Sequence, residues 1–127
     1  MRRLLIFLLL VLAGPAFAQE WRQAPEYDVL LTSYAIEPGR ILLKADRPVR
    51  LRFVNNSNQR HVFSAKSFFR TARLRGRDNA LVAGGELAVA PLSTETLVLV
   101  PKAGRYKAGS DNFLHRLLGM TGTIVVE

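Results

Sequence analysis

The chain consists largely of short runs of β-branched, aromatic and aliphatic residues, many of them bounded by turn residues such as proline, glycine and asparagine. The run 49–55 alternates apolar and charged residues, which is the period of a strand with one buried face. Comparable runs occur at 27–36, 41–43, 61–63, 86–89, 94–100, 104–107 and 120–126. Seven to eight strands at spacings of about 8–12 residues predict an all-β, antiparallel sandwich or barrel of Greek-key type.

One stretch, residues 67–77, departs from this pattern. Ser67 is a residue that can cap a helix, and a short helix from there would carry Phe68 and Phe69 on one side. Arg70 and Arg73 would then be exposed. We therefore expect a short helical insertion in an otherwise β domain.

The N-terminus has the three parts of a secretory signal peptide. Arg2 and Arg3 precede an apolar run at 4–13, and Ala16-Phe17-Ala18 supplies a small-residue cleavage site. The run has 10 residues, whereas a membrane span needs about 20. The predicted organisation is a signal peptide at 1–18 cleaved after Ala18, a loose N-terminal segment at 19–26, and one domain at 27–127.

The expected export limits the classes of partner that this protein can meet. The expected product is a monomeric periplasmic protein with no transmembrane segment after cleavage. Loss of Arg2 and Arg3 lowers the net charge from +8 to +6. A basic chain suggests an anionic partner, but export argues against nucleic acid and favours an acidic periplasmic or membrane protein.

The composition also limits the chemistry. The chain has no cysteine, which excludes disulfides, thiolate metal sites and cysteine nucleophiles. It contains no G-x-S-x-G elbow, no phosphate-binding loop and no G-x-G-x-x-G motif. We therefore expect a protein that is not an enzyme.

Two histidines, His61 and His115, lie beside predicted loops, and Met120 follows His115 by five positions. Imidazole and thioether ligands suit copper, whereas calcium and magnesium prefer oxygen. Two histidines are nevertheless ordinary in a chain of this length, and Met120 could equally be a core residue. Composition alone leaves both interpretations open.

The segments 54–63 and 115–126 resemble the cupredoxins, the Greek-key copper proteins that include plastocyanin and azurin. The first is similar to the family's asparagine-containing loop with its N-terminal histidine ligand, here His61. The second is similar to the C-terminal ligand loop, with His115 and Met120. The resemblance is greatest to the small exported cupredoxin-like domains, some of which are related to the N-terminal domain of the iron-uptake protein EfeO. It implies a Greek-key cupredoxin-like β-sandwich that binds copper through His61, His115 and Met120.

The sequence departs from the family at the copper-ligand cysteine. Counting back from His115, that position falls at Asn112 or Ser110, and neither can supply a thiolate. Blue copper sites need this ligand, so the expected site is non-blue. Cu(I) could take the two imidazoles and the thioether. Cu(II) could add Asp111 or Asn112, although Asp111 also suits a turn. The expected role is a copper carrier or buffer, with non-blue electron transfer as an alternative.

A basic stretch follows His61. It contains Arg60, Lys66, Arg70, Arg73, Arg75 and Arg77. It could be a solvated surface, or a docking patch for an acidic partner or an anionic membrane. Because it follows His61 in sequence, we expect such a patch near the metal end. A metal-free interaction domain that docks through this patch is the second functional hypothesis.

Overall fold

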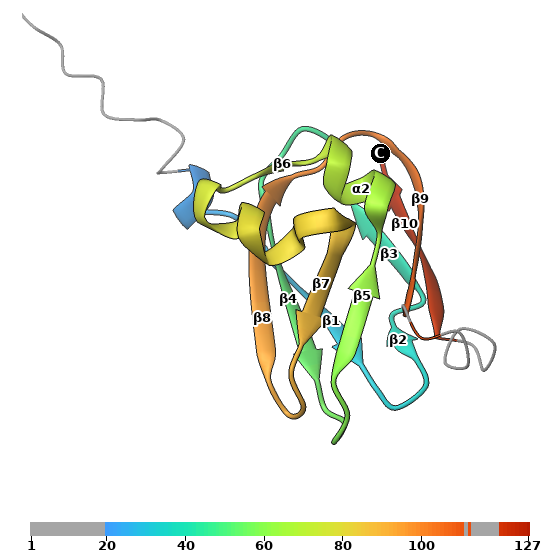
Figure 1. Ribbon diagram of the computed structural model, residues 1–127. Coiled ribbons are helices and arrows are strands. Elements are labelled where there is room, and N and C mark those ends of the chain that lie inside the picture. Colours follow the sequence, from blue (N-terminus) through green and yellow to red (C-terminus); the bar gives the residue numbers. More distant parts are fainter. Residues whose placement is uncertain (1–19, 111, 113–119) are drawn as a thin grey trace, which may run out of the picture.

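The computed structural model describes residues 20–110, 112 and 120–127, and they form two stacked five-stranded sheets (Figure 1). In the first sheet the strand order is β2 (Ile36–Glu37), β1 (Glu26–Leu31), β4 (Val49–Asn55), β8 (Thr94–Val100) and β6 (Arg73–Leu74). In the second it is β3 (Arg40–Leu43), β10 (Thr121–Val126), β9 (Gly104–Ser110), β5 (His61–Ser64) and β7 (Glu86–Val89). The predicted all-β sandwich with a short helix is confirmed.

The strand pairing is mixed rather than antiparallel throughout. β1 runs parallel to β4, and β3 runs parallel to β10, whereas the other pairs are antiparallel. The two parallel pairs arise because the chain crosses between sheets before it returns to a neighbour. The additional strands β2 and β6 have two residues each, which is too short for an alternating pattern to reveal.

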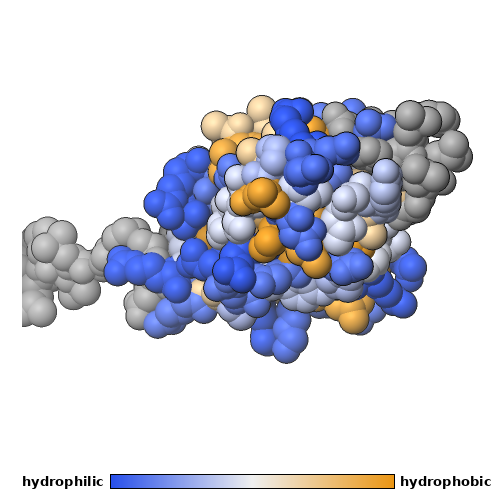
Figure 2. Space-filling model, turned by 90° about the horizontal axis from the view of Figure 1, so that it is seen from below, coloured by the Kyte–Doolittle hydropathy of each residue, from blue (hydrophilic) through white to orange (hydrophobic). Residues whose placement is uncertain are grey.

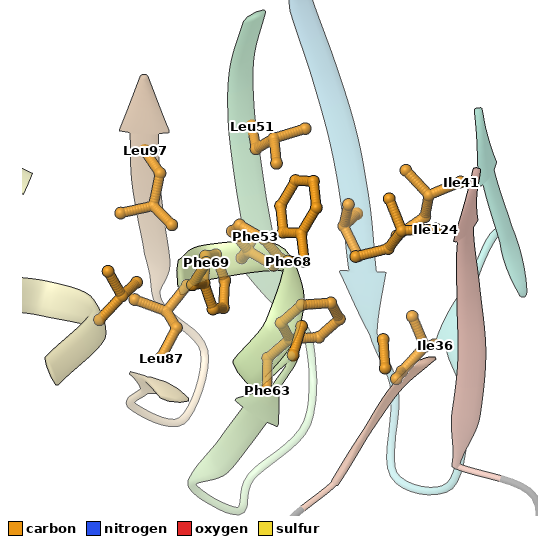
Figure 3. Close-up of a cluster of buried hydrophobic side chains, with 14 of the residues drawn as sticks. Ile36, Ile41, Leu51, Phe53, Phe63, Phe68, Phe69, Leu87, Leu97 and Ile124 are labelled. Carbon is orange, nitrogen blue, oxygen red and sulfur yellow. The ribbon is translucent and has the colours of Figure 1, made fainter. Parts of the chain in front are cut away.

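The core is formed by inward side chains of both sheets and of the helix (Figure 3). Phe53 of β4 and Phe63 of β5 join the sheets, with ring centroids 4.8 Å apart. Phe63 also contacts Phe69, at 6.1 Å between centroids, and Phe69 contacts Phe68 at 5.4 Å. This chain of aromatic contacts connects the insertion after β5 to the middle of the sandwich.

The insertion begins with helix α2 (Lys66–Thr71), in which Phe68 and Phe69 are buried and Arg70 is exposed, as predicted. Its N-cap is Ala65, without a side-chain cap, so Ser67 is not the cap and lies inside the helix. The prediction of Ser67 as the cap is wrong because burial of the two phenylalanines, rather than a capping hydroxyl, defines where the helix starts.

A 3-10 segment, η1 (Gly76–Gly85), completes the insertion and returns the chain to β7. Its last residue, Gly85, has a φ of +79°, and a Cβ there would lie 2.6 Å from the Cα of Lys66. Glycine thus allows η1 to approach α2 directly. The amide of Ala65 donates to the carbonyl of Gly85 at 3.1 Å and closes this contact.

The expected signal peptide, 1–18, lies outside the described residues. Residues 20–22 are helical, and the carbonyl of Trp21 accepts a hydrogen bond from Arg50 at 3.0 Å. The guanidinium of Arg73 lies 5.2 Å from the ring centroid of Trp21. Among the described residues, no helix is both long and apolar enough to cross a membrane.

A buried carboxylate, Asp78, ties the insertion to the first sheet. Its side chain is 4% exposed and accepts hydrogen bonds from Arg75 Nε at 3.0 Å and from the backbone amide of Val98 at 2.9 Å. The sequence offered no signal for this bond, because Asp78 and Val98 are remote in the chain and only the fold brings them together.

Replacing Asp78 with alanine should therefore destabilise the protein. Asp78→Ala leaves a largely buried Arg75 and a strand amide without their acceptor, which we expect to lower the free energy of unfolding by about 3 kcal/mol. Urea denaturation followed by circular dichroism measures the change.

Asp28→Ala is the matched control, because Asp28 also pairs with an arginine, Arg52 at 2.7 Å, but with half of its side chain exposed. Hydrogen bonds from Arg52 lower the pKa of Asp28, yet solvent screens the pair. A loss of stability in Asp28→Ala as large as in Asp78→Ala would contradict the structural role assigned to Asp78.

Candidate metal centre

One end of the sandwich, at the bottom of Figure 1, holds the strand ends that flank the two loops expected to carry metal ligands. β4 ends there at Asn55 and β5 starts at His61, while β9 ends at Ser110 and β10 follows Met120. We call this the His61 end. Figure 2 looks onto it from below and shows small apolar groups separated by hydrophilic residues.

The strand register shows that two of the candidate ligands, His61 and Met120, face the interior. Ser110 of β9 lies opposite Phe63 of β5, and its amide donates to the carbonyl of Met120 at 3.1 Å. Directly paired residues share a face of a sheet, and Phe63 and Met120 belong to the core. His61 precedes Phe63 by two residues, so it points to the same side. His61 and Met120 are each 1% exposed.

The imidazole of His61 is held through its Nε2 atom, which lies 3.0 Å from the hydroxyl oxygen of Ser57. That hydroxyl lies 2.8 Å from Oδ1 of Asn55. Oδ1 can only accept, so the single hydroxyl proton of Ser57 is directed to it. The Ser57 oxygen then accepts from His61, which favours the tautomer with a proton on Nε2 and a lone pair on Nδ1.

The orientation of Asn55 follows from its other contacts. Its Nδ2 donates to the backbone carbonyls of Gln59 at 2.8 Å, Val89 at 3.1 Å and Ala90 at 3.1 Å. Three acceptors on that side identify it as the amino group, so Oδ1 faces Ser57. Metal-binding histidines commonly have their second ring nitrogen held in this manner. The donor atoms and their support therefore fit a copper ligand at His61.

The resemblance at 54–63 pointed to His61 alone as a functional residue, so the supporting roles of Asn55 and Ser57 were missed. The asparagine-rich composition was the available signal. It could not show that one amide would bond across to β7, because this contact joins residues 34 positions apart.

The remaining predicted ligands are placed as follows. His115 and Asp111 lie outside the described residues. Asn112 is exposed, and its backbone amide donates to the hydroxyl of Ser110 at 3.1 Å. Within the described part of the chain, no three histidine, aspartate or glutamate side chains form a metal-binding group.

The structure distinguishes the two positions considered for the cysteine of the family. Ser110 is 2% exposed, and its side chain lies in an inward-facing row with those of Phe63 and Met120. Asn112, in contrast, is exposed. Of these two positions, Ser110 is therefore the one whose side chain points into the interior beside Met120, and that side chain is a hydroxyl.

The basic stretch does not lie together at the His61 end, which corrects the expectation from sequence. Arg60 is there, but α2, which carries Lys66 and Arg70, lies at the opposite end of β5 (Figure 1). The four residues of β5 cross the sandwich before α2 begins. Arg73 stacks on Trp21, and Arg75 pairs with Asp78. Lys66, Arg70 and Arg77 are exposed and have no ion pair among the described residues.

The tautomer of His61 can be tested in the metal-free protein. We expect nitrogen NMR above the pKa of the imidazole to show a protonated Nε2 and an unprotonated Nδ1 for His61, because Ser57 accepts from Nε2. Ser57→Ala should mix the two tautomers. The control is Asn58→Ala, at an exposed position in the same turn, which should leave the spectrum unchanged. A ring protonated on Nδ1 in the unmodified protein would contradict the assigned tautomer.

Comparison with known proteins supports the fold. No family model and no curated protein matches the sequence. Among solved structures, auracyanin B has a TM-score of 0.54 and 22% identity, with 82% of this chain and 89% of that chain covered. A dithionite-reduced auracyanin from Roseiflexus castenholzii has a TM-score of 0.57 and 15% identity, with coverages of 82% and 98%.

A multicopper oxidase from Pediococcus acidilactici has a TM-score of 0.60 and 13% identity, and the match covers 83% of this chain but 26% of the oxidase. At these identities the matches bear on architecture, and none of them supports the narrower resemblance to EfeO. The chain has the cupredoxin-like β-sandwich fold.

Proposed function

We propose that this protein binds copper at the His61 end and acts as a periplasmic carrier or buffer. The proposal depends above all on one observation, the buried His61 ring whose Nε2 is held by Ser57. This support presents Nδ1 as the nitrogen suited to a metal. In this proposal the exported protein is a monomer and not an enzyme.

The proposed ligands are His61, His115 and Met120. Imidazole and thioether are the softer ligands of the available set, and this combination suits Cu(I). Ser110 supplies no thiolate, so the site would lack the short Cu–S bond of blue copper proteins. Copper is then cargo that is bound and released, which favours a carrier or buffer over non-blue electron transfer.

Copper affinity should depend on both the ligands and their support. We expect His61→Ala and His115→Ala each to weaken Cu(I) binding more than Ser57→Ala does, and Ser57→Ala to weaken it by about 10–100-fold because the ring loses its hydrogen bond. Competition with a chromophoric Cu(I) chelator measures the affinities. Asn58→Ala is the control, and unchanged affinity in both histidine variants would overturn the proposal.

Met120→Leu separates a ligand role from a core role. Leucine has a similar volume, so the core is retained while the thioether is lost. Because a soft thioether favours Cu(I), the variant should lose Cu(I) affinity more than Cu(II) affinity. Equal affinity of the variant and the unmodified protein for Cu(I) would assign Met120 to the core alone.

Restoring a thiolate tests the position assigned to the lost cysteine. We expect Ser110→Cys loaded with Cu(II) to gain an intense visible sulfur-to-copper absorption. The side chain of residue 110 points into the interior beside Met120, and two histidines with a cysteine are the ligands of a blue copper site. Asn112→Cys, at an exposed position, is the matched control. Colour in Asn112→Cys and none in Ser110→Cys would reverse the assignment.

A further inference from the structure

A second surface of interest lies at the end of the sandwich opposite His61. A cavity of about 430 Å³ opens between α2 and η1, and we call it the α2 groove. Its lining residues are Lys66, Phe69, Arg70, Leu74, Asn79, Val82, Gly84 and Gly85. This lining combines an apolar floor with a basic rim and includes no acidic residue.

The floor is recessed. Phe69 is 4% exposed and Val82 is 7% exposed, and Leu74 is partly buried against the core. These apolar atoms lie below the surface instead of protruding from it. A hollow of this kind accepts an apolar side chain from a partner, whereas insertion into a bilayer requires apolar side chains that project outward.

The rim is positively charged. Lys66 and Arg70 are one helical turn apart on α2, so both side chains lie on the same side of the helix and both line the groove. Neither forms an ion pair with a described residue. Arg73 and Arg75, in contrast, are engaged with Trp21 and Asp78. Lys66 and Arg70 are thus the two residues of the basic stretch that line the groove, and no described carboxylate neutralises their charge.

We propose that the α2 groove is a docking site for an acidic segment of a partner protein that inserts one apolar side chain between its acidic residues. The recessed floor would accept the apolar side chain, and Lys66 and Arg70 would pair with the flanking carboxylates. The site lies at the far end of the sandwich from His61, so a docked partner leaves the His61 end accessible. The proposal does not depend on copper binding.

A labelled pentapeptide with phenylalanine between two pairs of glutamates is a suitable probe, and fluorescence anisotropy of the full mature protein with this peptide measures binding. We expect it to bind about tenfold more tightly than the same peptide with alanine at the centre, because the floor takes the aromatic ring. Added salt should weaken binding of both peptides. Equal binding of the two peptides, or no binding, would overturn the proposal.

Two variants locate the site. Lys66→Gln with Arg70→Gln should weaken binding of the phenylalanine peptide by about tenfold or more. The control Arg40→Gln with Lys44→Gln, at exposed positions outside the groove, removes the same charge and should have little effect. Similar losses in both double variants would show nonspecific attraction and would contradict the proposal.

Two further measurements complete the test. Asn79→Trp fills the groove without changing the charge, so it should abolish the preference for the phenylalanine peptide. This variant tests the proposal even if the charge variants fold poorly. A retained preference for the phenylalanine peptide would contradict the assignment of the groove as the binding site.

Sedimentation with phosphatidylglycerol vesicles tests the membrane alternative. Vesicle binding that needs Lys66 and Arg70, without peptide binding, would replace the protein partner with a lipid surface.

Discussion

The side-chain amide of Asn55 joins the two sheets at the end where His61 lies. It projects from the end of β4 in the first sheet and donates to the carbonyl of Val89, which ends β7 in the second. The same amide accepts from Ser57, and Ser57 holds His61. The orientation of the candidate ligand therefore depends on a contact that also closes the sandwich. A substitution at Asn55 would therefore change both the stability of this end of the sandwich and the orientation of the candidate ligand His61.

A second feature of the His61 end is a row of inward-facing side chains, formed by Phe63, Ser110 and Met120. Their register is set by backbone bonds of β5, β9 and β10, so the position of Ser110 does not depend on its own side chain. The serine hydroxyl lies in this row beside the core side chains of Phe63 and Met120.

Most strands were predictable from sequence because they are short β-rich runs bounded by turn residues, as 49–55 illustrates, whereas the two-residue strands β2 and β6 were not. The parallel pairing of β1 with β4 was not, since alternation reports which face is buried and says nothing about the neighbour. Naming His61 and Met120 as candidate ligands required only their residue types and the family resemblance, and their role stays a prediction. The hydrogen bonds that support His61 were not predictable, because the bond from Asn55 to Val89 spans two sheets. The choice between Ser110 and Asn112 likewise required the register of β9.

The basic stretch shows most clearly how little the sequence reveals about position in space. Because the stretch follows His61 in sequence, it was expected to lie near His61 in the fold, and most of it does not. A strand carries the chain from one end of a sandwich to the other, so residues on either side of β5 lie at opposite ends. Arg60 and Lys66 are six positions apart in sequence, and β5 separates them. The consequence bears on both proposals. Lys66 and Arg70 line the α2 groove and do not adjoin the candidate metal centre, so under the two proposals their charge would meet an acidic partner and would not oppose the binding of copper. Arg60 remains at the His61 end.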